Sequence, residues 1–188
     1  MNEGCTGLIE DCLTGDETAI ARFIEEHQFG VFRLALSILS DPGEANEATQ
    51  DTFILALKAM NTYREQAKLK SWLFKIALNT SRSRLRKRNA LERLHHRLAA
   101  LFRAQEQHVP TPEDIVVAQE KDGALWQALE RLGEKHRVPI VLRYYHDFSI
   151  AEIATILNIK EGTVHSRLSI AREKLRSELA GFINPTGE

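Results

Sequence analysis

The sequence predicts an all-α fold, with two small helical domains joined by a partly helical linker and a helix-turn-helix as the C-terminal domain. Apolar residues recur at spacings of three and four along most of the 188 residues. Several of these stretches begin with residues that cap helices, and two amphipathic stretches near the C-terminus are separated by a very short turn. We expect the domains at residues 1–90 and 112–183, with residues 91–111 as the linker.

The first long helix is expected from Asp16 to Leu39. A second helix should follow at once, because Asp41 is a favourable N-cap and Pro42 has a fixed φ that suits the first helical position. It is expected to reach about Met60. The apolar stripe of the first helix contains Ile20, Phe23, Ile24, Val31, Leu34, Ala35, Ile38 and Leu39.

A polar loop at residues 61–70 separates these helices from a third, which is expected to begin near Ser71. This helix becomes a basic run at Arg82–Arg88. Apolar residues at helical spacing between 91 and 102 indicate either that the helix continues or that a separate linker helix begins. Another helix is expected at residues 111–132.

The last two expected helices have the pattern of a helix-turn-helix. Ser149 and Glu152 form a capping box at the start of the first, and Asn158 suits the left-handed residue that ends it. The second helix begins near Glu161. Its inward stripe is Val164, Leu168, Ala171 and Leu175.

The outer face of that second helix is mostly small and polar. Such side chains can contact phosphates and base edges in a major groove. The alternative is an ordinary helical hairpin with a solvated outer face. The face contains Thr163, His165, Ser166, Arg167, Ser169, Arg172 and Lys174, with Ile170 as its apolar exception.

Charge is unevenly distributed although the net charge is only −1. Residues 1–26 contain seven acids and one base, whereas residues 82–103 contain eight bases and one acid. This segregation gives a local positive surface suited to nucleic acid. The same charge asymmetry suggests that the acidic N-terminus folds back on the basic helix as an intramolecular brake.

Several classes of protein are not expected. The two cysteines are too few for a disulfide framework and lack partners at metal-binding spacing. We find no nucleophile–base pair, phosphate loop or metal-ligand set, so we expect no catalytic residue, metal or cofactor. No apolar run approaches the roughly eighteen residues of a membrane span, and acids replace the lysines of a signal peptide. A cytoplasmic protein without membrane insertion is therefore expected.

Two blocks of sequence resemble bacterial sigma factors. The C-terminal DNA-binding segment of that family is similar to EIATIL and EGTVHSRLSIAREKL, and the upstream LERLGEKHRVPIVLRYY continues the likeness. The polymerase-binding and promoter-melting part is similar to EANEATQDTFILAL followed by LKSWLFKIALNTSRSRLRKR. With both blocks in order over residues 16–89 and 112–180, the chain is identified as a member of the extracytoplasmic-function (ECF) group of the sigma-70 superfamily.

The resemblance implies a non-enzymatic adaptor that directs promoter recognition and transcription initiation. Its implied partners are the clamp and flap regions of core RNA polymerase, promoter DNA as duplex and melted single strand, and an anti-sigma factor. Polymerase binding is implied for Gln50, Asp51 and Phe53. Binding of the melted minus-ten strand is implied for Tyr63, Arg64, Arg82 and Arg84. Binding of the minus-thirty-five duplex is implied for Thr163, His165, Ser166, Arg167, Ser169, Ile170 and Arg172.

The chain departs from the family pattern at four positions. Leu78 and Ser83 replace the usual Arg and Asp, and His165 and Ile170 replace frequent cations of the recognition helix. The main alternative function is a helix-turn-helix regulator that binds duplex DNA independently of polymerase. An interaction adaptor without DNA affinity fits the segregated charge less well.

Overall fold

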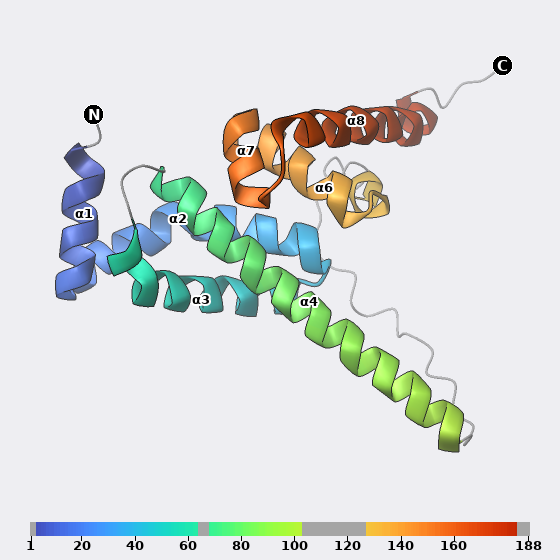
Figure 1. Cartoon of the computed structure of the whole chain (residues 1–188), viewed down its shortest axis with the longest axis horizontal. Helices are drawn as coiled ribbons and strands as arrows, with labels where there is room; N and C mark the ends of the chain where they lie inside the picture. The colour runs from blue at the N-terminus through green and yellow to red at the C-terminus, as the bar shows by residue number, and fades with distance from the viewer. Residues whose placement is uncertain (1–2, 64–67, 103–126, 184–188) are drawn as a thin grey trace.

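The computed structural model describes residues 3–63, 68–102 and 127–183. Within these residues every regular element is a helix, which confirms the all-α prediction (Figure 1). The N-terminal half, residues 3–102, contains α1 (Glu3–Thr14), α2 (Glu17–Leu39), α3 (Pro42–Ala59), the 3-10 turn η1 (Met60–Thr62) and α4 (Leu69–Phe102). The C-terminal half, residues 127–183, contains α6 (Glu134–Ile140), the π-helical segment η3 (Val141–Tyr145), α7 (Ile150–Leu157) and α8 (Glu161–Ile183).

Local capping sets the ends of α2 and α3. The Asp16 carboxylate accepts hydrogen bonds from the backbone N–H groups of Thr18 and Ala19, at 2.8 and 3.2 Å. Ser40 ends α2 in the left-handed region, with φ of 55°. The Asp41 carboxylate then accepts a 2.7 Å bond from the Glu44 N–H, and Pro42 is the first residue of α3. Asp41 caps α3 where the sequence predicts it, and α2 begins within one residue of its predicted start, because capping depends on neighbouring residues.

The third predicted helix is longer than its start suggested. It begins at Leu69 and runs without interruption to Phe102, so the apolar spacing after residue 91 belongs to α4 itself. The predicted start of a further helix at Thr111 lies outside the described residues. The start of the chain also forms a helix, α1, that the sequence analysis did not predict.

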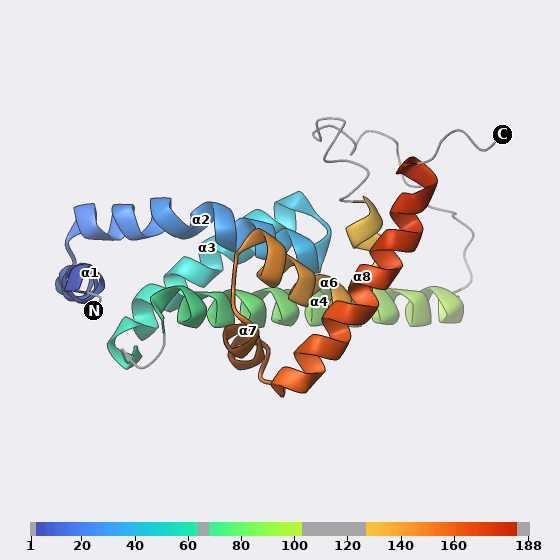
Figure 2. The same cartoon turned by 90° about the horizontal axis from the view of Figure 1, so that it is seen from above.

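The described part of the acidic N-terminus lies away from the C-terminal part of the basic helix (Figures 1 and 2). α1 contacts α2 and η1, and Figures 1 and 2 show it far from the C-terminal part of α4. Its buried residues Ile9 and Cys12 belong to the core. The prediction that the N-terminus is an intramolecular brake on the basic helix is therefore wrong for the described part of α1. Apolar packing fixes α1 against α2 and η1, far from the C-terminal part of α4.

The C-terminal half contains the predicted helix-turn-helix. The Ser149 hydroxyl accepts a 3.3 Å hydrogen bond from the Glu152 N–H, and the Glu152 carboxylate accepts one of 2.8 Å from the Ser149 N–H. Asn158 ends α7 in the left-handed region, with φ of 53°. The predicted stripe of α8 faces inward, with Val164, Leu168 and Ala171 buried and Leu175 packed against the core.

The two halves pack against one another around a common core. α7 lies against α4, and α6 and η3 lie against α2 (Figure 2). A glycine in α2 permits this approach: a Cβ on Gly30 would lie 3.1 Å from Cζ of Phe74 and 3.6 Å from Cε1 of His146. The core cluster takes side chains from both halves, including Phe23, Leu34, Leu73, Phe74, Leu142, Phe148, Ile153 and Leu168.

Candidate nucleic-acid and polymerase interfaces

The outer face of α8 is accessible along its length. Thr163 and Arg167 are half-buried, and the other five predicted residues are exposed: His165, Ser166, Ser169, Ile170 and Arg172. No ion pair joins Arg167 or Arg172 to another described residue. The Ser166 hydroxyl donates a 3.1 Å hydrogen bond to the Thr163 carbonyl, which leaves its oxygen lone pairs as acceptors. The face therefore offers two cations, several hydrogen-bonding groups and one apolar side chain.

Arg167 also affects the pKa of a buried histidine, His136, on the neighbouring helix α6. His136 on α6 is 7% exposed, and burial lowers the pKa of its imidazole. Lys135, Lys174 and Arg167 lower this pKa further by charge repulsion. Positive charge is thus concentrated where α6 packs against α8, and such a surface suits contact with phosphates.

The α3 residues predicted to bind polymerase do not share one environment. Gln50 is exposed and Asp51 is half-buried at the surface, whereas Phe53 is only 5% exposed. The Phe53 ring packs edge-on against Phe23, with ring centroids 5.8 Å apart. The prediction of an accessible Phe53 is corrected, because its ring belongs to the core.

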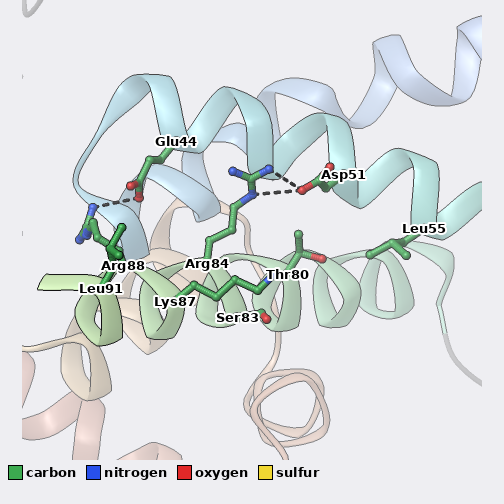
Figure 3. A pocket seen from close by; sticks show the side chains of 9 residues that line it. All are labelled: Glu44, Asp51, Leu55, Thr80, Ser83, Arg84, Lys87, Arg88 and Leu91. Atoms are coloured by element: carbon green, nitrogen blue, oxygen red, sulfur yellow. Dashed lines mark hydrogen bonds and ion pairs between the residues drawn. The ribbon is translucent and has the colours of Figure 1, made fainter. Parts of the chain in front are cut away.

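Sequence reasoning missed the apolar side chains on this surface. Ile54 and Leu55 are half exposed on α3, and Leu91 is half exposed on α4. All three lie outside the buried stripes, and an apolar residue outside its stripe was the available signal. Leu55 and Leu91 line an open groove of about 550 Å³ between α3 and α4 (Figure 3).

Ion pairs across this groove hold α4 against α3 (Figure 3). Nη2 of Arg84 lies 2.6 Å from Oδ2 of Asp51, and Nη1 lies 2.5 Å from Oε2 of Glu47. The hydrogen bond to Asp51 is the main cause that raises the pKa of Arg84. Further along, Arg88 donates to the Glu44 carboxylate at 2.9 Å. The structure thereby joins Arg84, predicted to bind DNA, to Asp51, predicted to bind polymerase.

The other predicted minus-ten residues lie elsewhere. The half-buried ring of Tyr63 stands edge-on to Trp72, with centroids 5.6 Å apart. Nε of Arg82 donates a 2.7 Å hydrogen bond to the Glu134 carboxylate of the C-terminal half. Arg64 lies outside the described residues. The structure therefore does not bring Tyr63, Arg82 and Arg84 into one cluster.

The described part of the chain contains no group of three or more His, Cys, Asp or Glu side chains placed to hold a metal. It also contains no helix with the length and apolar character needed to cross a membrane.

Comparisons with known proteins agree with the two sequence blocks. The family described as Sigma-70 region 2 matches residues 23–91, and the family described as Sigma-70, region 4 matches residues 122–175. The ECF RNA polymerase sigma factor SigW of Bacillus subtilis is 31% identical over 176 residues, covering 91% of this chain and 94% of SigW. The chain belongs to the ECF family of RNA polymerase sigma factors. As a sigma factor it binds core RNA polymerase and directs promoter recognition and transcription initiation.

Other ECF and related sigma factors match over nearly their whole length. The RNA polymerase sigma-H factor of Pseudomonas aeruginosa is 27% identical over 177 residues, covering 92% of each chain. Among solved structures, the sigma factor RpoE in complex with the anti-sigma factor NepR from Bartonella quintana is 26% identical, with a TM-score of 0.67. That match covers 85% of this ECF sigma factor and 96% of RpoE.

Proposed function

We propose that this sigma factor divides promoter recognition among three surfaces. The unit at residues 1–90 docks on polymerase through α3 and holds the melted minus-ten strand with Tyr63 and with Arg82 of α4. Residues 91–111 link it to the unit at residues 112–183, whose α8 reads the minus-thirty-five duplex. The observation that carries this proposal is the outer face of α8, which is exposed and has two arginines without an ion pair among the described residues.

Duplex recognition by α8 separates positioning from base reading. Arg167 and Arg172 contact phosphates, because a guanidinium can form two parallel hydrogen bonds to phosphate oxygens. Ser166 presents its lone pairs to base donors, since its hydrogen is used by Thr163. Ile170 is 42% exposed and suits apolar contact with a thymine methyl group. Thr163 completes the phosphate contacts, and the base-reading residues are His165, Ser166, Ser169 and Ile170.

Polymerase docking uses the polar and apolar side chains at the surface of α3. Gln50 and Asp51 supply the polar contacts, and Ile54 and Leu55 supply apolar area that is half exposed. A mixture of this kind is typical of protein interfaces. Because Arg84 is held by Asp51 and Glu47, we assign it to positioning the Asp51 carboxylate rather than to binding DNA in this conformation.

Minus-ten binding combines an aromatic ring with cations. Tyr63 and Arg82 supply these groups in the described residues, and Arg64 is retained from the sequence-based prediction. Single strands bind to surfaces that pair positive charge with stacking rings. This activity places the protein with RNA polymerase in the cytoplasm.

Run-off transcription tests the proposal. Purified protein, with and without a bacterial core polymerase, is given a library of its own upstream regions. Discrete start sites only when both are present support the proposed division of surfaces. The contrary result is that the protein alone shifts specific duplex DNA and gives no start site with polymerase. In that case α8 would bind DNA without the other two surfaces, and the proposal would be wrong.

An anti-sigma factor is also proposed as a partner. The support is that the similar RpoE structure is a complex with an anti-sigma factor. The test is co-expression of the full-length chain with the product of each gene adjacent to its own. Stable complexes that no longer support run-off transcription are the expected result, and retained transcription in every complex would contradict it.

A further inference from the structure

The seam, where the C-terminal half packs on α2 and α4, encloses the imidazole of His146 among aromatic rings (Figure 2). The Phe74 ring of α4 lies edge-on to the imidazole, with ring centroids 4.7 Å apart. Tyr145 and Phe148 flank it from the C-terminal half, with centroids 4.9 and 6.4 Å from that of the imidazole. Phe74 and Phe148 also pack against each other, at 5.0 Å. Rings from both halves therefore form a cage around His146.

Helix α2 closes this cage at a glycine. A Cβ on Gly30 would lie 3.6 Å from Cε1 and 3.7 Å from Nδ1 of His146, so the backbone of α2 lies directly against the imidazole. Nε2 of His146 is buried and has no hydrogen-bond partner among the described residues. A neutral imidazole can carry its hydrogen on Nδ1, whereas a protonated one carries a hydrogen on Nε2 as well. The cage therefore leaves a protonated ring with an unsatisfied buried donor, which costs free energy.

Cations face the cage from both packed helices of the N-terminal half. Nζ of Lys70 on α4 donates a 2.9 Å hydrogen bond to the His146 carbonyl. Arg33 on α2 lies over the Tyr145 ring, with Cζ 5.2 Å from the ring centroid, and its Nε donates to the Tyr145 hydroxyl at 3.2 Å. A proton on the imidazole would add a further positive charge beside these two.

The neighbouring carboxylates do not offset this positive charge. Glu152 on α7 is paired with Lys68, with Nζ and Oε1 3.0 Å apart, and Asp147 is exposed. Burial, followed by repulsion from Lys70 and Arg33, lowers the pKa of the imidazole from 6.5 to about 4. Separation of the halves removes the contacts with α2 and α4 and moves this pKa back towards 6.5. The imidazole thus favours the packed form above pH 6.5, and this contribution is lost as the pH falls towards 4.

We propose that His146 is a proton-sensitive latch: uptake of one proton by its ring releases the C-terminal half from α2 and α4. Acidification then makes the sigma factor more available to core polymerase. This second step rests on the proposed division of surfaces, whereas the latch itself does not. The minus-ten and minus-thirty-five elements lie about 25 base pairs apart, roughly 85 Å at 3.4 Å per base pair, so α4 and α8 must separate to reach both.

The two pKa values set the size of the effect. Between pH 7.5 and pH 5.5, the ratio of open to packed protein should rise about tenfold, because the open form takes up a proton near pH 6.5 and the packed form only near pH 4. Where the packed form predominates, the apparent affinity for core polymerase is proportional to the open fraction. That affinity should therefore also rise about tenfold.

The test compares the full-length wild type with His146→Phe and His146→Gln, neither of which can take up a proton at this position. Affinity for purified core polymerase is measured without DNA at pH 7.5 and pH 5.5, by fluorescence anisotropy of the labelled sigma factor. The wild type should gain about tenfold more affinity on acidification than either variant gains. The matched control is His27→Gln, which removes a half-buried imidazole that packs on Phe23 within the N-terminal half and should retain the gain.

A further variant separates the latch from a direct contact with polymerase. Phe74→Ala removes the ring of α4 from the cage and loosens the seam without a proton. It should bind core polymerase more tightly than the wild type at pH 7.5 and gain less on acidification. A full acid gain in Phe74→Ala would mean that protonated His146 touches polymerase itself, and the latch would be wrong.

Other results would also overturn the latch. An acid gain in both His146 variants equal to that of the wild type would do so, because another group would then take up the proton. Loss of helix content by the wild type at pH 5.5, measured by far-UV circular dichroism, would show unfolding of the halves in place of their separation. Failure of run-off transcription, with the expected acid gain in core binding, would instead count against the proposed division of surfaces and leave the latch standing.

Discussion

Among the described residues, His146 has the largest shift in pKa on folding. It is 6% exposed, and its Nε2 has no hydrogen-bond partner among the described residues. Burial, with added repulsion from Lys70 and Arg33, lowers its pKa from 6.5 to about 4. The unfolded chain therefore takes up a proton at higher pH than the folded chain does, and stability falls as the pH drops from 6.5 towards 4.

This linkage predicts an acid-sensitive fold. Protonation linked to His146 lowers the free energy of unfolding by about 3 kcal/mol near pH 4, and it has no effect well above the ordinary pKa of histidine. His146→Phe keeps an aromatic ring where the two halves pack together and removes the titratable imidazole. The free energy of urea unfolding of this variant should therefore change less between pH 7 and pH 5 than that of the wild type. The control His165→Gln removes an exposed imidazole and should keep the acid loss. An acid loss in His146→Phe equal to that of the wild type would contradict the prediction.

Arg167 provides a residue-scale test of DNA recognition. Arg167→Ala should weaken duplex binding by the polymerase holoenzyme on all sequences alike, because phosphates carry no base information. The slope of log affinity against log salt should fall by about 0.9 for the lost contact. Arg176→Ala, an exposed arginine further along α8, is the matched control and should retain the slope. Loss confined to particular sequences would assign Arg167 to base reading.

Residues could be placed from sequence where their neighbours along the chain decide their role. The caps at Asp41 and Ser149 follow from this rule. The pairing of Arg84 with Asp51 and of Arg82 with Glu134 joins positions far apart in sequence, which no local pattern contains. The burial of Phe53 likewise depends on its contact with Phe23 of α2, which no pattern within α3 contains.

At the scale of elements, the start of α7 depends on a single side chain. Ser149→Ala removes the hydroxyl that accepts the Glu152 N–H, and it should lower stability by about 1 kcal/mol. Ser177→Ala is the control, because that serine is exposed within α8 and bonds only to the Lys174 carbonyl among the described residues. Chemical denaturation measures both, and equal effects would show that the cap contributes nothing specific.

Other elements show where pattern reasoning stops. The starts of α3 and α7 are confirmed because cap and apolar period agree at both of them, whereas the apolar period alone placed the starts of α2 and α8. α1 was missed because its acids dominate a short stripe of which Ile9 and Cys12 are the buried part. The change from α6 to the π-helical η3 has no sequence signal that we can identify.

At the scale of the molecule, the sequence predicts two helical domains but not their contact. The seam joins Phe74 to Phe148 and Lys68 to Glu152, pairs separated by more than seventy residues. Hydrophobic periodicity predicts that Phe74 and Phe148 are each buried in a core, but it does not predict that the two cores are in contact. The candidate surfaces were predictable as faces of single helices, whereas their partial occlusion required the tertiary structure.

A common core predicts cooperative unfolding. Because burial at the seam stabilises both halves together, the wild-type chain should show one thermal transition by calorimetry, with equal calorimetric and van't Hoff enthalpies. In Phe74→Ala, the packing between the halves loses the ring that contacts His146 and Phe148, and two transitions should become resolved as the halves unfold separately. Glu178→Gln should keep one transition, since its pair with Arg131 lies within one half. Two resolved transitions in the wild type at low salt would mean that the aromatic seam does not couple the halves.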